Sequence, residues 1–261
     1  MLVPLGRLPG AVFKIDSCMK IVAVIPARLA STRLPRKMLR EIHGKPLVMW
    51  VHDAVRSSPL VEDVIIATDS EEIRSACRPF SSKVLMTSEK HRSGSERVQE
   101  VSQSVAADVY LNVQGDEPLI RTSHIETLIG LMRDPRIQVG TLKTPAAPED
   151  IRNPAAVKVV TDLSGRALYF SRSTIPHDRD NSRPRYFKHL GIYAYRKWAL
   201  DRLRRLPESL LERAERLEQL RLLENGIPIY VRETPFDSIG VDTEEDLARV
   251  IRIVEKEKLR P

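Results

Sequence analysis

The sequence predicts an α/β fold built on a doubly wound, mostly parallel sheet, and three observations lead to this prediction. Short apolar runs rich in β-branched residues, such as residues 20–25, are typical of strands buried on both faces. These runs alternate with stretches of helical periodicity, which is the order of a parallel sheet with crossover helices. Polar loops directly follow the runs, at the carboxyl ends of strands where such sheets bind ligands. The fold class therefore indicates where the chemistry should lie.

The alternation is clearest in the first half of the chain. Its predicted strands cover residues 20–25, 64–68, 83–86 and 108–113. Its predicted helices cover residues 47–57 and 95–104, and a third begins with the capping pattern at residues 69–72. The second half is less regular, with strands predicted at residues 157–160, 167–170, 190–195 and 228–232 and helices at 210–223 and 243–256. The chain has no internal repeat, so we expect one domain over residues 19–261 with an inserted lobe at about residues 145–195.

The first 18 residues stand apart from this pattern. Proline and glycine interrupt every apolar stretch in this segment, so it lacks the continuous apolar core of a signal peptide. Met19 directly precedes the first predicted strand. We therefore expect residues 1–18 to be a leader or the product of a mis-called start.

Composition narrows the class of protein. The formal net charge of +7 suits anionic partners such as nucleotides, phosphosugars or nucleic acid. The chain has no block of five or more consecutive basic residues and only 5% aromatic residues, which disfavours a nucleic-acid-binding surface. No apolar run is long enough to cross a bilayer, and Cys18 and Cys77 form neither a metal motif nor a disulfide framework. These features predict a cytoplasmic protein with no membrane or nucleic-acid partner.

The loop at residues 26–37, PARLASTRLPRK, follows the first predicted strand. Arg28, Arg33 and Lys37 place three cations within ten residues. Guanidinium groups match pairs of phosphate oxygens, lysine supplies a point charge, and Ser31 adds a hydroxyl group. The loop contains neither GxxxxGK[ST] nor GxGxxG, and an ordinary surface loop is the alternative. Its position after the first strand favours a phosphate-binding loop.

Two acidic loops are candidates for a metal site. Asp116 lies in NVQGDEP at the end of the fourth predicted strand, and magnesium prefers one or two carboxylates together with substrate phosphates. Glu117 should point the other way if the backbone there is extended. Asp242 lies in GVDT, where it could instead cap the last helix. Sequence spacing does not decide whether Asp242 faces Asp116.

The segment HRSGSER at residues 91–97 opens a helix, and helix N-termini bind anions. Its Ser93, Gly94 and Ser95 could therefore face a base or a phosphate. His189 and Tyr193 are four residues apart in a predicted strand, so they share one face and suggest the wall of a pocket.

These motifs together are similar to those of one family. The segments are PARLASTRLPRK, ATDSEEI, HRSGSER, NVQGDEP, NPAAVKVV, ALYFSRSTIP, KHLGIYAYR, LEQLRLLENG and GVDTEEDL. In this order they closely resemble the 3-deoxy-manno-octulosonate (Kdo) cytidylyltransferases, from about residue 20 to about residue 254. KHLGIY and LEQLR distinguish this family from the related sialic-acid enzymes.

The resemblance implies a reaction, a fold and a site. The reaction joins CTP and Kdo to give CMP-Kdo and pyrophosphate for lipopolysaccharide synthesis. The fold implied is nucleotide-diphospho-sugar transferase-like, with a smaller dimerisation lobe and usually a homodimer. The residues implied to bind CTP are Arg28, Ser31, Arg33, Lys37, Ser93, Gly94, Ser95 and Gln114. Those implied to bind the sugar are Arg172, His189, Tyr193, Glu218 and Gln219, and those implied to ligate Mg²⁺ are Asp116 and Asp242. Arg28, Lys37, Asp116 and Asp242 would carry the catalysis.

Departures and alternatives bear on this interpretation. Arg36 stands where the family often has glycine, and Ser95 where threonine is common. The segment at residues 179–187 is shorter than in some members, so the dimerisation lobe can differ in detail. A cytidylyltransferase for another acidic sugar, such as 8-amino-Kdo or a sialic acid, is the nearest alternative, and a basic nucleic-acid-binding protein is a more distant one.

Overall fold

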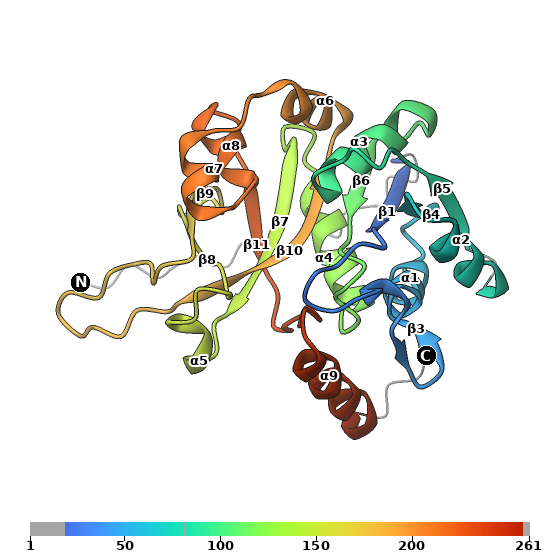
Figure 1. The fold of residues 1–261 in the computed structure, drawn as a ribbon. Helices are drawn as coiled ribbons and strands as arrows, with labels where there is room; N and C mark the ends of the chain where they lie inside the picture. Colours follow the sequence, from blue (N-terminus) through green and yellow to red (C-terminus); the bar gives the residue numbers. More distant parts are fainter. Residues whose placement is uncertain (1–18, 81, 258–261) are drawn as a thin grey trace.

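The computed structural model describes residues 19–80 and 82–257 and contains a central mixed sheet (Figure 1). The strand order in the sheet is β11-β7-β10-β6-β1-β4-β5, and β8 and β9 continue from β10. Helices cover both faces of this sheet. The predicted α/β, doubly wound fold is therefore confirmed. The predicted segment at residues 1–18 lies outside the described residues.

The first half of the chain forms the parallel part of the sheet. The strand β1 (Ile21–Ala27) lies between β4 (Asp63–Thr68) and β6 (Val109–Asn112), and β5 (Lys83–Met86) follows β4 at the edge. All these neighbours pair in parallel. The four predicted strands of this half are confirmed, and their carboxyl ends meet at one edge of the sheet.

The second half adds strands of mixed direction. The strand β10 (Phe187–Tyr195) is antiparallel to both β6 and β7 (Val139–Pro145), whereas β11 (Tyr230–Glu233) is parallel to β7. The hairpin of β8 (Lys158–Thr161) and β9 (Ala167–Ser171) pairs with the start of β10. The strand β7 was not predicted from the sequence, because glycine, lysine and proline interrupt its apolar pattern.

The residues of β1 alternate between two apolar cores. Ile21, Ala23 and Ile25 belong to the core that packs against α1 (Leu47–Arg56), α2 (Glu71–Cys77) and α4 (Thr122–Met132). Val22 and Val24 belong to the core on the opposite face, with α3 (Gly94–Ser104), α6 (Lys197–Arg205) and α8 (Gln219–Glu224). This double burial explains why the strand reads as a continuous apolar run.

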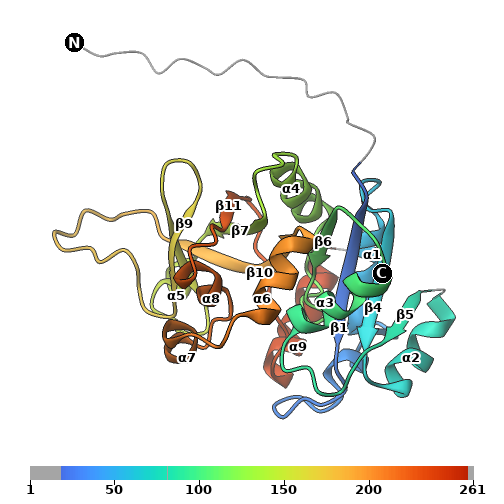
Figure 2. The same ribbon diagram turned by 90° about the horizontal axis from the view of Figure 1, so that it is seen from above.

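The remaining elements surround the sheet (Figure 2). They are α5 (Pro148–Ile151), α7 (Leu210–Glu215), α9 (Glu244–Glu257), the short pair β2 (Glu41–Ile42) and β3 (Lys45–Pro46), and the 3-10 turns η1 (Lys37–Leu39) and η2 (Arg78–Phe80). The helix α9 forms a third apolar cluster with β2 and α1. The single helix predicted at residues 210–223 is wrong, because Arg216 has a φ of 54° and separates α7 from α8.

The region proposed as an inserted lobe contains α5, the β8–β9 hairpin and most of β10. The connection from β9 to β10 extends away from the body of the molecule (Figure 2). Its assignment as a dimerisation lobe stays a prediction. Within the described residues, no helix combines the length and apolar character needed to cross a bilayer.

Candidate active site

Three loops meet over Pro26, at the end of β1. Two glycines make this approach possible. A Cβ atom on Gly94 would lie 3.1 Å from Pro26 Cγ, and one on Gly115 would lie 3.1 Å from the Pro26 carbonyl oxygen. These separations are tighter than most Cβ contacts, so a larger residue would require its neighbours to shift by a few tenths of an ångström, whereas glycine fits without a shift. The glycines thus bring HRSGSER and NVQGDEP beside the basic loop.

The smaller of two adjoining cavities, about 220 Å³ in volume, lies among these loops. Its lining includes Arg28, Ser31, Arg33, Lys37, Ser93, Gly94, Gln114, Asp116 and Asp242. Within the described part of the chain, no acidic side chain forms an ion pair with Arg28. The structure therefore brings together nearly all of the residues predicted to bind CTP and metal, and Ser95 lies in the adjoining cavity.

Lys37 lies between the two predicted metal ligands. Its Nζ donates to Asp116 Oδ2 at 2.5 Å and to Asp242 Oδ1 at 2.9 Å, while Arg33 pairs with Asp242 Oδ2 at 2.9 Å. Burial alone would lower the pKa of Lys37, but the charge and hydrogen bond of Asp116 and then of Asp242 raise it above its usual value. Burial would raise the pKa of Asp242, but Lys37 and Arg33 lower it. Both carboxylates thus face one cationic centre.

Asp242 is not the cap of the last helix. Thr243 Oγ1 accepts a hydrogen bond from the backbone N–H of Asp246 at 3.2 Å, so the cap belongs to Thr243. The backbone N–H of Val241 donates to the Asp116 carbonyl oxygen at 2.8 Å. This bond joins the two acidic loops directly, and the Asp242 carboxylate is left to face the smaller cavity.

The loop before α3 is held by buried charges. Arg97 is 3% exposed; it donates to Thr87 Oγ1 at 2.6 Å and pairs with Asp69 of the ATDSEEI segment. His91 contacts the carboxylate of Glu100. These contacts fix the loop that carries Ser93, and they give His91 a structural role.

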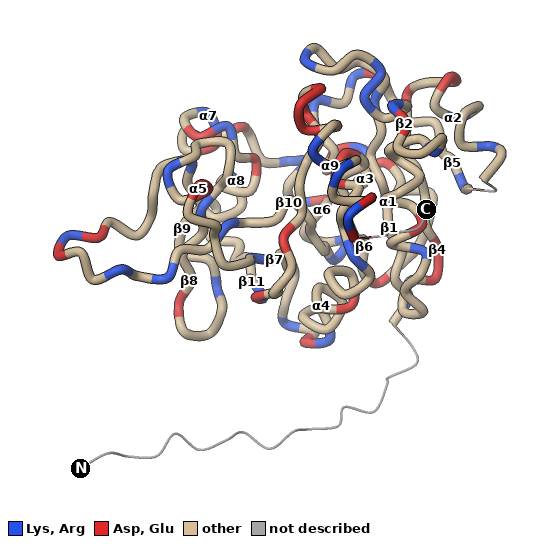
Figure 3. Tube along the Cα trace, turned by 90° about the horizontal axis from the view of Figure 1, so that it is seen from below, with Lys and Arg blue, Asp and Glu red and all other residues tan. Residues whose placement is uncertain are grey.

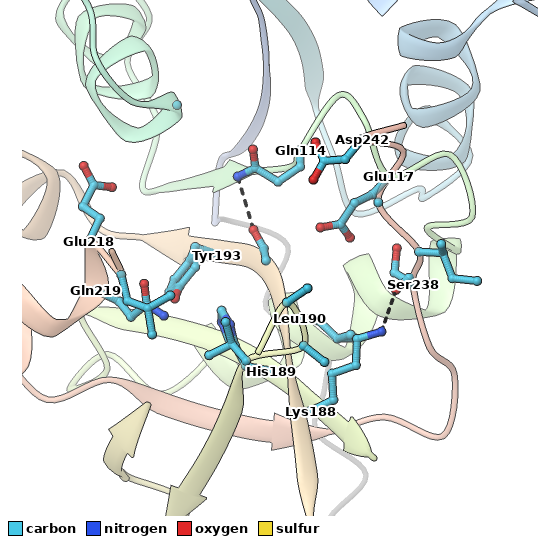
Figure 4. Close-up of a pocket in the computed structure, with 18 of the residues that line it drawn as sticks. Gln114, Glu117, Lys188, His189, Leu190, Tyr193, Glu218, Gln219, Ser238 and Asp242 are labelled. Atoms are coloured by element: carbon cyan, nitrogen blue, oxygen red, sulfur yellow. Dashed lines mark hydrogen bonds between the residues drawn. The ribbon is translucent and has the colours of Figure 1, made fainter. Parts of the chain in front are cut away.

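The larger cavity, about 650 Å³ in volume, adjoins the smaller one and shares Arg33, Gly94, Gln114 and Asp242 with it. Figure 4 shows Gln114, Glu117 and Asp242 on one side of this cavity, opposite Glu218, Gln219, Tyr193 and His189. Ser95 donates to the carboxylate of Glu218, which ties α3 to the start of α8. Glu218 and Gln219, which the resemblance implies bind the sugar, line this cavity.

His189 and Tyr193 lie on the same face of β10, with ring centroids 5.4 Å apart. Burial lowers the pKa of His189 to about 3 and raises the pKa of Tyr193 well above its usual value. His189 Nε2 lies 3.1 Å from Thr141 Oγ1, a neutral partner that is itself buried. Both aromatic side chains therefore stay uncharged at neutral pH.

Arg172 lies outside both cavities in this chain. Its guanidinium donates to the carbonyl oxygens of Glu215 at 2.7 Å and Pro154 at 3.0 Å. It thereby links the end of α7 to the segment before β8. The structure does not bring Arg172 to the other predicted sugar-binding residues.

Several residues of the larger cavity were not assigned from sequence. Glu117 lines it, whereas Asp116 lines the smaller one, so the two neighbours point to opposite sides as expected. Burial and the charge of Asp116 raise the pKa of Glu117 to about 7. Lys188, Asn112 and Ser238 also contribute to the lining. Asn112 and Lys188 lie within the quoted motifs NVQGDEP and KHLGIYAYR, whereas Ser238 lies outside the quoted motifs.

A basic cavity beside two carboxylates, at the carboxyl edge of a doubly wound sheet, is the arrangement of a nucleotidyltransferase. Residues 22–233 match the family described as Cytidylyltransferase. The 3-deoxy-manno-octulosonate cytidylyltransferase of Koribacter versatilis is 63% identical over 236 residues, which cover 90% of each chain. That of Acidobacterium capsulatum is 52% identical and covers 93% of this chain and 99% of its own.

A solved structure of CMP:2-keto-3-deoxy-manno-octonic acid synthetase complexed with CTP shows the same fold. It aligns with a TM-score of 0.88 and 44% identity, over 91% of this chain and 99% of that one. The chain belongs to the cytidylyltransferase family, and within it to the 3-deoxy-manno-octulosonate cytidylyltransferases.

Proposed function

We propose that the protein transfers a cytidylyl group from CTP to Kdo, giving CMP-Kdo and pyrophosphate for lipopolysaccharide synthesis in the cytoplasm. The anomeric hydroxyl oxygen of the sugar attacks the α-phosphorus of CTP. The bond from this phosphorus to the α,β-bridging oxygen breaks, pyrophosphate leaves, and the hydroxyl proton passes to solvent. The observation that carries the proposal is the Lys37, Asp116 and Asp242 cluster, because Asp242 belongs to both cavities.

The smaller cavity would hold the triphosphate. Both substrates are anionic, so fixed cations must offset their repulsion when they meet. Arg28, Arg33 and Lys37 supply three such charges, and Ser31, Ser93 and Gly94 line the same space. Gln114 reaches both cavities and donates to the Gly191 carbonyl oxygen at 3.3 Å, which suits a position against the nucleoside. Ser95 would lie on the nucleoside side as well.

The acidic pair suits magnesium. Two carboxylates from separate loops are aimed at one cationic atom, and magnesium prefers such a pair together with substrate phosphates. Asp116 and Asp242 would therefore hold Mg²⁺. When bound, the metal would stabilise charge on the phosphates and lower the pKa of the attacking hydroxyl group.

The larger cavity would hold the sugar. His189, Tyr193, Glu218 and Gln219 line it with neutral and acidic polar groups, which suit the hydroxyl groups of a polyol. We assign no sugar contact to Arg172 within this chain. We further propose a homodimer formed through the lobe at residues 145–195, which light scattering after size-exclusion chromatography would test.

The reaction is tested by pyrophosphate release with Mg²⁺, with CTP, UTP and ATP each offered with Kdo, 8-amino-Kdo and a sialic acid. We expect release with CTP and Kdo. Release with another sugar would keep the nucleotide and metal assignments and discard the choice of Kdo. No release from folded protein with any pair would overturn the proposal.

The nucleic-acid-binding alternative requires a continuous basic face and binding that falls steeply with salt. In the view of Figure 3, basic and acidic segments alternate along the chain. We therefore retain the enzyme as the proposal, and a salt titration of binding to duplex DNA would test the alternative.

A further inference from the structure

The larger cavity contains buried polar atoms that lack a partner within the protein. Among the described residues, the buried side-chain atoms without a hydrogen bond are Asn112 Oδ1, Tyr193 OH and Ser238 Oγ. All three residues line this one cavity, and none is more than 7% exposed. Native proteins rarely leave such groups unsatisfied. Their coincidence in one cavity indicates that a ligand supplies the missing partners.

Tyr193 already belongs to the proposed sugar site, whereas Asn112 and Ser238 have no assigned role. We propose that Asn112 and Ser238 determine specificity for the acceptor sugar by binding its hydroxyl groups. This inference rests on the proposed function, and it names two of the residues through which that function would select its substrate.

Asn112 lies at the end of β6, directly opposite Tyr193 of β10. Its amide oxygen only accepts hydrogen bonds, so the missing partner must be a donor. A sugar hydroxyl group is such a donor, and so is the amino group of a cytosine base. Asn112 lines the larger cavity directly opposite Tyr193, which belongs to the proposed sugar site, and this position favours the sugar.

Ser238 lies in the loop between β11 and α9, apart from Asn112 in the fold. Lys188 fixes this loop, since its Nζ donates to the Asp237 carboxylate at 3.0 Å and to the Ser238 carbonyl oxygen at 3.3 Å (Figure 4). The Ser238 hydroxyl faces Glu117 closely enough to counter part of the rise in the pKa of that carboxyl, but no well-aligned hydrogen bond joins the two side chains. Because Asn112 and Ser238 come from separate elements, we infer that they bind different hydroxyl groups of the sugar.

Removing an unpartnered group should weaken binding of the sugar without lowering the stability of the protein. Ser238→Ala deletes a hydroxyl group that makes no hydrogen bond in the protein, so Tm should stay unchanged or rise. The KM for Kdo should increase about tenfold, as expected for one lost hydrogen bond to a ligand, and the KM for CTP should stay unchanged. Asn112→Leu should behave in the same way, and Asn112→Ser is a milder replacement should the leucine disturb folding.

Ser102→Ala is the matched control. Ser102 is 3% exposed, close to the 4% of Ser238, but its Oγ donates to the Gln99 carbonyl oxygen at 2.7 Å and it lines neither cavity. This variant should lower Tm and leave both KM values unchanged. The contrast between Ser238→Ala and Ser102→Ala separates recognition of a ligand from a contribution to folding.

The experiment measures pyrophosphate release from the full chain while Kdo and CTP are varied separately, together with thermal unfolding of each variant. An unchanged KM for Kdo in both cavity variants would show that these atoms bind only water and would overturn the inference. A rise in the KM for CTP alone would make them nucleotide contacts and would also overturn it. If the wild-type protein is inactive with Kdo, the proposed function fails first and the inference fails with it.

Discussion

The two cavities differ in whether their polar groups have hydrogen-bond or ion-pair partners within the protein. In the smaller cavity Lys37 pairs with Asp116 and Asp242, so the charges at its centre have partners inside the protein. In the larger cavity, neutral groups such as Asn112 and Ser238 stay buried without one. An unpaired buried charge costs far more than an unpaired amide or hydroxyl group. We therefore expect the paired charges of the smaller cavity to hold the triphosphate, and the unpartnered groups of the larger cavity to select the sugar.

The largest expected effect lies on the charged side. Asp116→Asn removes one carboxylate from the pair and should lower turnover by about a thousandfold, the scale of losing a central electrostatic contact in catalysis. The variant should still fold, because asparagine has the same shape and can accept a hydrogen bond from Lys37.

Turnover of Asp116→Asn and its circular dichroism spectrum would be measured beside those of Asp134→Asn. Asp134 is an acidic residue that pairs with Arg136 and lines neither cavity. Near-normal turnover of Asp116→Asn would remove Asp116 from the proposed metal site and weaken the contrast between the cavities.

A second prediction concerns the buried ion pair between α7 and α8, the helix that contributes Gln219 to the larger cavity. Arg221 and Glu212 pair through two hydrogen bonds while each side chain is only 10% exposed, and they join α8 to α7. Arg221→Met should lower the free energy of unfolding by about 3 kcal/mol, because the Glu212 carboxylate would be left buried and unpaired. Urea denaturation would measure this change.

The exposed pair between Arg40 and Glu244 is the control for Arg221→Met. Arg40→Met should cost less than about 1 kcal/mol, since exposed ion pairs contribute little to stability. Equal losses in the two variants would contradict the distinction between buried charges that need partners and exposed charges that do not.

A third prediction uses the pH dependence of stability to test whether buried His189 in the larger cavity stays uncharged. Burial lowers the pKa of His189 to about 3 in the folded protein, below its value of about 6.5 in an unfolded chain. Between these values the unfolded state binds a proton that the folded state does not. His189 therefore does not reduce the free energy of unfolding above about pH 6.5, and it reduces it progressively as the pH falls below that value. At pH 5 the loss from this residue should be about 2 kcal/mol.

Urea denaturation at pH 7.5 and pH 5 would measure the loss in the wild-type protein and in His189→Asn. The variant should lose about 2 kcal/mol less between the two conditions, because asparagine does not titrate. His124, whose pKa is also lowered by burial, contributes equally to both proteins and cancels in the difference.

The fold could be predicted from sequence where burial leaves a simple pattern. Strands buried on both faces, such as β1, appear as continuous apolar runs. The strand β7 was not predicted because it combines buried glycine and threonine with Lys143, so its sequence lacks such a run. The break at Arg216 was also missed, since a positive φ leaves no signal when the residue is not glycine.

The site could be predicted where one loop carries its own chemistry. The basic loop and Asp116 were identified by residue type and by position after a strand. The pairing of Asp242 with Asp116 was implied by the family resemblance but could not be predicted from residue type or spacing, because it depends on two loops far apart in the chain meeting at Lys37. Asn112 and Ser238 were missed because only the three-dimensional structure shows which buried groups lack a partner.

The smallest expected effect concerns Arg36, which stands in the basic loop where the family often has glycine. Its φ of 56° lies in the left-handed region, which favours glycine, and this explains the family preference. Its guanidinium contacts Glu72 and lies outside both cavities, so its charge is directed away from the proposed phosphate site.

Arg36→Gly should therefore raise the free energy of unfolding by about 0.5–1 kcal/mol, because relief of the strained backbone exceeds the greater entropy of glycine in the unfolded chain. Arg36→Ala removes the same charge and the same exposed ion pair but keeps a Cβ atom in the left-handed conformation. It should show no gain in urea denaturation. Equal stabilities for the two variants would mean that charge and not backbone geometry governs this position, and the glycine of the family would need another explanation.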